Sequence, residues 1–307
     1  MEQLVFILVF LAIGILLRLS GRLPETAPKV LGGWVINVAL PATALKSVHA
    51  VEVTGDWLLA AATPWLGVAL ALAVLLPAGR ALGWSRQRTG GLLLVAGWGN
   101  TSFVGIPMIL AFAGTDWVAL GLMIDLFGSY LALSILGIGI AALASEGRLP
   151  LRAVVLRIAT FPPFVALLVA LATNHLHRPP WLEEGIALLA ATMTPIALAA
   201  VGFALRLDRV AGRLLPVCAA LGFRLLLAPA ALLALYLAGE AAGLLPVDPP
   251  VRNVAVLEMA MPPMLGAAIL AMEHDLEPDL VALVIGVGIP LSLATASLWW
   301  QVLMLLS

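Results

Sequence analysis

Three ionisable residues, Asp125, Arg224 and Glu258, lie inside long apolar stretches of the sequence. Charged groups are rare and usually functional in such stretches. A buried arginine can attract an anion, and a buried carboxylate can exchange a proton or bind a cation. Asp125 and Arg224 could instead form a structural ion pair, and Glu258 could hydrogen-bond backbone groups. The sequence leaves these alternatives open.

Two apolar stretches are interrupted by residues that disfavour helix. One contains Asn100, Thr101 and Ser102 between several glycines and Pro107, and the other contains Met261–Met264 with two prolines. Proline removes a backbone donor and glycine weakens a helix. Free backbone groups at membrane depth are tolerated only inside protein or beside a water-filled cavity. The breaks therefore predict a binding site, although capping of the broken helix or a simple kink would also use these residues.

The predicted site residues come from both breaks and from neighbouring apolar stretches. We expect Asp125 and Glu258 to take part in ion or proton coupling. Asn37 precedes a proline in an early stretch, where an interhelical hydrogen bond is the alternative. The residues expected to bind substrate are Asn37, Asn100, Thr101, Ser102, Pro107, Arg224, Met261, Pro262 and Pro263.

The composition requires a membrane protein. Of 307 residues, 63% are hydrophobic and 11% are charged, whereas a soluble domain carries about 25% charged residues. The mean hydropathy is +1.11. The apolar runs are continuous and do not alternate with polar residues, which favours helices over a membrane β-barrel. We therefore predict an all-α integral membrane protein.

Polar, proline and glycine residues divide the chain into ten apolar segments, each close to the roughly 20 residues of a membrane-spanning helix. We number these predicted spans 1 to 10. They cover residues 4–19, 29–48, 57–79, 89–113, 116–143, 152–173, 182–205, 214–239, 251–273 and 279–305.

Basic residues predict the orientation. Arg and Lys gather in the connections around 18–29, 80–88, 148–157 and 206–213, while the alternate connections hold Lys46, Arg178 and Arg252. Positive charge remains on the cytoplasmic side. We therefore expect a multi-pass protein of the cell inner membrane with both termini outside the cytoplasm.

The two halves of the chain, 1–151 and 152–307, resemble each other. The segment 116–120 (DWVAL) opens span 5, and 279–283 (DLVAL) opens span 10. The two breaks fall in spans 4 and 9. Because each half holds five spans, an odd number, the second half must be inverted relative to the first. Inverted repeats are common in secondary transporters, whose substrate sites lie at paired broken helices.

The motifs in spans 2, 4 and 9 resemble those of the auxin efflux carrier family of permeases. They are 37–42 (NVALPA), 100–107 (NTSFVGIP) and 260–263 (AMPP). The resemblance implies ten helices, with helices 4 and 9 crossing at their breaks, as in bile-acid/sodium symporters and sodium/proton antiporters. It also implies a scaffold of spans 1, 2, 6 and 7, often dimerising, and a moving domain of spans 3–5 and 8–10.

The resemblance further implies secondary active transport of a small organic anion by an elevator-type, alternating-access motion. Candidate substrates are malonate, malate, lactate or an auxin-like acid. The alternative is a sodium- or proton-coupled carrier of an amphipathic, steroid-like acid. The sequence holds no zinc-protease motif, no paired intramembrane aspartate and no Walker motif. We therefore expect no enzyme activity, cofactor or metal site. The net charge of −1 gives no hint of a nucleic-acid partner. The expected partners are membrane lipid and, as the resemblance implies, a second copy of the chain.

Overall fold

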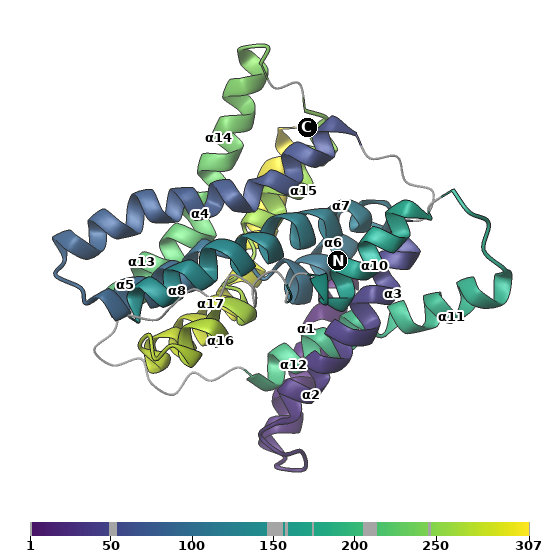
Figure 1. The fold of residues 1–307 in the computed structure, drawn as a ribbon, viewed down its shortest axis with the longest axis horizontal. Helices are drawn as coiled ribbons and strands as arrows, with labels where there is room; N and C mark the ends of the chain where they lie inside the picture. The colour runs from purple at the N-terminus through teal and green to yellow at the C-terminus, as the bar shows by residue number, and fades with distance from the viewer. Residues whose placement is uncertain are drawn as a thin grey trace. The chain divides into compact units, whose positions relative to one another are not determined.

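Helices make up nearly all of the regular structure in the computed structural model (Figure 1). The structure describes residues 2–48, 54–145, 156, 159–173, 175–204, 214–244 and 247–306. Among these residues the only extended pairing is one isolated antiparallel bridge. The all-α prediction is therefore confirmed for the described part of the chain.

Several helical runs are long and apolar enough to cross a membrane, which confirms a membrane-embedded protein. They correspond to predicted spans 2, 3, 5, 7, 8 and 10. The six runs are Ala27–Ser47, Gly55–Ala81, Thr115–Ala144, Pro180–Ala204, Leu214–Ala241 and Pro278–Leu305. The boundary predicted at 151/152 and the basic residues of 148–157 and 206–213 lie outside the described residues.

The chain divides into two compact units. Unit 1 comprises Met1–Val53, Ser102–Leu122 and Val155–Leu205, and unit 2 comprises Thr54–Thr101, Met123–Val154 and Arg206–Ser307. The main helices of unit 1 are α1 (Glu2–Leu19), α2 (Ala27–Trp34), η1 (Val35–Ala39), α3 (Leu40–Ser47), α6 (Ile106–Phe112), α10 (Pro162–Ala172), α11 (Pro180–Ala191) and α12 (Met193–Ala204).

Glycines allow α1 and α12 of unit 1 to pack backbone against backbone. A methyl group at Gly14 would lie 2.1 Å from the carbonyl oxygen of Ala199. A methyl group at Gly202 would likewise lie 2.1 Å from the carbonyl oxygen of Leu11. Small residues are favoured at such interfaces because apolar surface alone does not drive helices together in lipid.

Unit 2 contains both helix breaks. α5 (Arg86–Gly97) ends before the first break, and the chain resumes helix at Thr101 in η2 (Thr101–Gly105). α15 (Pro249–Met259) ends before the second break, and α16 (Leu265–Glu273) follows it. Pro262 and Pro263 lack backbone donors, which explains why the helix cannot continue through them. The other helices of unit 2 are α4 (Gly55–Ala81), η4 (Ile124–Tyr130), η5 (Leu133–Gly137), α8 (Ile138–Ala144), α13 (Leu214–Gly222), η6 (Phe223–Leu227), α14 (Ala228–Ala241) and α17 (Pro278–Leu305).

Two of the wide, π-helical turns of unit 2, η4 and η6, carry ionisable residues. Such turns disturb the regular i to i−4 ladder and often mark functional positions. A tryptophan from another helix bonds a carbonyl in each. Trp65 Nε1 donates to Phe127 O at 3.1 Å, and Trp299 Nε1 donates to Leu225 O at 2.9 Å. These bonds help to stabilise the turns that carry Asp125 and Arg224.

Candidate functional site

The two breaks of unit 2 cross and hydrogen-bond each other. Asn100 N donates to Pro262 O at 2.7 Å, and Met264 N donates to Trp98 O at 3.0 Å. Gly99 and Pro263 lie between these bonds as an antiparallel bridge. Buried backbone groups must find partners, and here each break provides them for the other. We call residues 98–101 and 260–264 the crossing.

Arg224 reaches the crossing from η6 and is 2% exposed. Among the described residues, the acceptors of its guanidinium hydrogen bonds are all backbone carbonyls. Nε bonds Met261 O at 3.0 Å, and Nη1 bonds Gly97 O at 3.3 Å. Nη2 bonds Met259 O at 2.6 Å and Glu258 O at 3.4 Å. Arg224 therefore binds the last carbonyls of α5 and α15 together with the second break.

This placement affects the electrostatics of the crossing. The last carbonyls of a helix carry a partial negative charge and the first amides carry a partial positive charge. Arg224 offsets the negative ends of α5 and α15. The helices that begin at Thr101 and Leu265 start beside the same crossing. The hydrogen bonds of Arg224 do not neutralise the partial positive charge at these two helix starts. An anion would therefore be favoured at those helix starts.

Gly99 makes room for the guanidinium. A methyl group at this position would lie 2.4 Å from Arg224 Nη2, 3.0 Å from Arg224 Cζ and 3.2 Å from Glu258 O. The backbone at Gly99 does not have a positive φ. The requirement for glycine here is therefore one of space, not of backbone conformation.

Asp125 contacts the crossing from η4. The carboxylate is 2% exposed and its Oδ1 accepts a hydrogen bond from Thr101 Oγ1. A hydrogen bond to a charged acceptor is stronger than one between neutral groups. This bond ties Thr101 to the π-helical turn of η4.

Glu258, by contrast, is buried without hydrogen bonds to its carboxylate. It is 1% exposed, and neither carboxylate oxygen has a partner among the described residues. The same is true of Ser129 Oγ, which lies one helical turn beyond Asp125 in η4. Both side chains line one small cavity with Arg224 and Thr101. Its volume of about 10 Å³ is close to the space that one water molecule needs.

The structure gathers most of the predicted site residues in unit 2. Asn100, Thr101, Met261, Pro262 and Pro263 form the crossing, and Arg224, Asp125 and Glu258 surround it. Ser102, Pro107 and Asn37 belong to unit 1. Asn37 is exposed, and its amide donates to Gly33 O within the same helical run at 2.8 Å.

Gly99, Ser129 and Thr63 belong to the site as well, although their sequence positions alone did not predict it. Thr63 also lines the cavity, and its hydroxyl donates to Ala60 O at 2.8 Å. Ala60 O would ordinarily bond the amide that Pro64 lacks. Ser129 could have been found from its spacing, because residues four apart share a helix face.

The chain is similar to known transport proteins along its whole length. A family model described as "Membrane transport protein" matches residues 1–149 and 146–300. An uncharacterized transporter from Methanothermobacter thermautotrophicus is 28% identical over 309 residues, which cover 98% of each chain. A second uncharacterized transporter, from Methanocaldococcus jannaschii, is 23% identical over 313 residues, which cover 99% of each chain.

Proposed function

Because this chain belongs to the membrane transport protein family, which includes the auxin efflux carriers that its motifs resemble, we propose that it is a secondary active transporter of a small organic anion. The family indicates membrane transport and not catalysis. The substrate class that we propose is a small carboxylate such as malonate, malate or lactate, or an auxin-like acid.

The geometry of Arg224 supports an anionic substrate. One bond from its guanidinium goes to a carbonyl of the crossing, and three go to carbonyls at the ends of α5 and α15, so Arg224 acts mainly by offsetting the negative helix ends. A carboxylate would then bind at the starts of the helices at Thr101 and Leu265. Asn100, which is 2% exposed, would add a neutral side-chain amide to this site.

The size of the cavity favours a small substrate. A space of about 10 Å³ must widen before any organic anion enters, and a two- to four-carbon acid requires much less widening than a steroid-like acid. We therefore prefer the small carboxylate to the steroid-like alternative.

Glu258 supports coupling to protons. Its carboxylate lies in the same cavity as Arg224, and Asp125 bonds Thr101, which also lines that cavity. With both carboxylates ionised, these three side chains would carry one net negative charge and oppose an anion. A proton on Glu258 removes that charge and also removes the cost of a buried carboxylate that accepts no hydrogen bond. We propose that proton and anion bind together.

We further propose ten spans in two inverted halves and an elevator-type motion. The paired breaks and the meeting of the two matched segments near 146–149 support the repeat. The division into units supports separate scaffold and moving parts, because spans 1, 2, 6 and 7 fall in unit 1 and spans 3 and 8–10 in unit 2. Segment 102–122, which includes parts of spans 4 and 5, groups with unit 1. The boundary of the moving part that we propose therefore lies within these two spans and not in the loops between helices.

The cellular location of the protein, its orientation and its oligomeric state are also proposals. We propose a cell inner membrane protein with both termini outside the cytoplasm, acting as a homodimer through spans 2 and 7. Large apolar side chains are exposed there, including Val30, Trp181 and Leu188. Mass measurement in mild detergent and in native membrane fragments tests the dimer, and a monomer in both would contradict it.

Transport in proteoliposomes tests the function. We expect labelled malonate, malate or lactate to enter faster when a pH gradient supplies protons from the same side, and a sodium gradient to have no effect. In Glu258→Gln, which carries no titratable proton, anion exchange should continue while the response to the pH gradient disappears. Glu273→Gln, an exposed change in α16, serves as the matched control.

Three results would contradict these proposals. Uptake of a steroid-like acid but of no small carboxylate would overturn the proposed substrate class. An unchanged pH response in Glu258→Gln would overturn the role of Glu258. Absence of flux for every acid in a well-folded protein would overturn the anion-transport proposal itself.

A further inference from the structure

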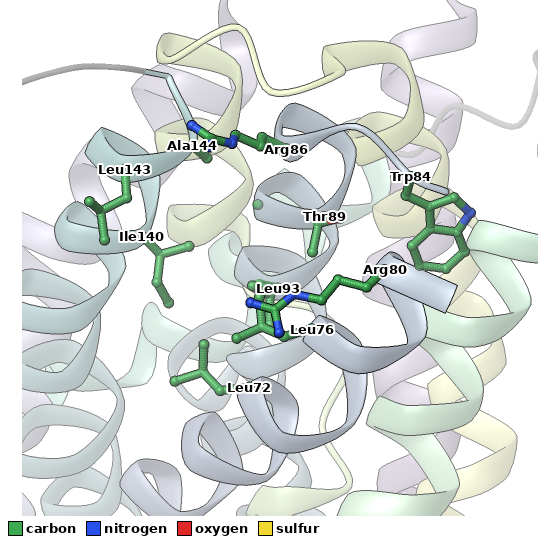
Figure 2. A pocket seen from close by; sticks show the side chains of 11 residues that line it. Leu72, Leu76, Arg80, Trp84, Arg86, Thr89, Leu93, Ile140, Leu143 and Ala144 are labelled. Carbon is green, nitrogen blue, oxygen red and sulfur yellow. The ribbon is translucent and has the colours of Figure 1, made fainter. Parts of the chain in front are cut away.

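A second cavity in unit 2 lies away from the crossing, between α4, α5 and α8 (Figure 2). It is far larger than the cavity beside Glu258, with a volume of about 460 Å³, which falls in the range of ligand-binding pockets. Leucine and isoleucine side chains form one wall, among them Leu72, Leu93 and Ile140. The cavity is therefore a groove for an apolar chain along the helices.

Two arginines give this groove a charged end. Arg80, in the last turn of α4, extends its guanidinium across the groove towards Leu93, and Arg86, at the start of α5, places its guanidinium beside Ala144 (Figure 2). Both arginines are exposed. The described lining of the groove contains no acidic side chain, so its polar end is positive.

A neighbouring arginine, unlike these two, forms an ion pair. Arg88 lies two residues after Arg86 and bonds Glu277 at 2.8 Å. Arg80 and Arg86 have no such ion pair among the described residues. Their charge remains available to a ligand at the mouth of the groove.

The groove is also shaped by close helix packing. A methyl group at Gly90 would lie 2.4 Å from Ala144 Cβ, so α5 and α8 approach closely where both line the groove. Trp84 lines the rim, and tryptophan is enriched at the level of lipid headgroups. An apolar groove, a tryptophan at its rim and two arginines with no ion pair among the described residues thus occur at one end of three helices.

We propose that this groove binds an anionic phospholipid. The anionic headgroup of the lipid faces the guanidinium groups of Arg80 and Arg86, and an acyl chain lies along Leu72, Leu93 and Ile140. Basic pockets between membrane helices attract anionic headgroups, and arginine bonds phosphate oxygens in a planar, two-pronged geometry. A zwitterionic lipid would bring its own positive choline group to the same arginines and bind more weakly.

Native mass spectrometry of the delipidated full chain tests this proposal. We compare binding of dioleoylphosphatidylglycerol with that of dioleoylphosphatidylcholine, which has the same acyl chains. Each basic residue near an anionic headgroup contributes roughly five-fold in affinity, and two contribute about thirty-fold. We therefore expect Arg80→Gln with Arg86→Gln to lower phosphatidylglycerol binding about thirty-fold and to leave phosphatidylcholine binding unchanged.

Two further variants distinguish this site from general charge effects. Arg22→Gln with Lys29→Gln removes two exposed positive charges from another connection and should leave lipid affinity unchanged. Arg80→Lys with Arg86→Lys should retain most of the binding. Equal affinity of the wild-type chain for the two lipids, or an equal loss in the Arg22/Lys29 control, would overturn the proposal.

Discussion

Replacing Gly99 by alanine tests whether the position of Arg224 holds the crossing together. The added methyl carbon would lie 2.4 Å from Arg224 Nη2, so the guanidinium must move by about 1 Å to reach ordinary contact. The 2.6 Å bond from Nη2 to Met259 O cannot survive such a displacement unchanged.

The expected loss of stability follows from these contacts. Forcing an extra methyl group into a filled site costs about 1–3 kcal/mol. Weakening a buried hydrogen bond from a charged donor costs about 1.5–3 kcal/mol more. The sum, roughly 2.5–6 kcal/mol, is a large part of the 5–15 kcal/mol by which proteins are ordinarily stable.

Thermal unfolding in mild detergent measures this loss. We expect the melting temperature of Gly99→Ala to fall by about 10 °C, with a loss of anion transport. Gly222→Ala is the matched control, because a methyl group there has no neighbour within 4 Å and lies two residues before Arg224 in the same helical run. Wild-type melting and transport in Gly99→Ala would refute the argument.

Three further substitutions address the same region. Asn100→Ala should raise the apparent KM for the anion about ten-fold with little change in melting temperature, because the backbone bond to Pro262 remains; an unchanged KM in flux assays would exclude the side chain from binding. Arg224→Lys should lower the melting temperature by several degrees, since lysine keeps the charge but not the planar set of donors; equal stability would show that charge alone suffices. Gly288→Ala should cost about 1–3 kcal/mol, because its methyl group would lie 2.8 Å from the ring of Pro263; unaltered unfolding would mean that the ring can shift freely.

The helices and their breaks could be predicted because strong local signals encode them. Long apolar runs specify the membrane helices, and Pro262 and Pro263 remove the donors that a continuous helix needs. The family was recognised from motifs in three spans, and the match over the whole chain confirms it.

The chemistry around Arg224 could not be predicted, because it depends on tertiary contacts. Its hydrogen-bond acceptors come from α5 and α15, far away in the sequence. The sequence suggests Asp125 as one possible partner for Arg224. The backbone carbonyls that Arg224 bonds come close to it only because the two breaks meet in the folded chain. The wide turns of η4 and η6 were missed for a similar reason, since tryptophans from other helices bond their carbonyls.

The two breaks that form the crossing are joined through main-chain atoms, so the junction does not depend on particular side chains. Both bonds, from Asn100 N to Pro262 O and from Met264 N to Trp98 O, use groups that almost any residue supplies. Side chains at positions 100 and 264 can therefore be exchanged while the two breaks stay joined, provided that neither becomes proline. In the substrate site that we propose, selectivity for a new solute can therefore change by substitution at these positions without rebuilding the framework that presents them.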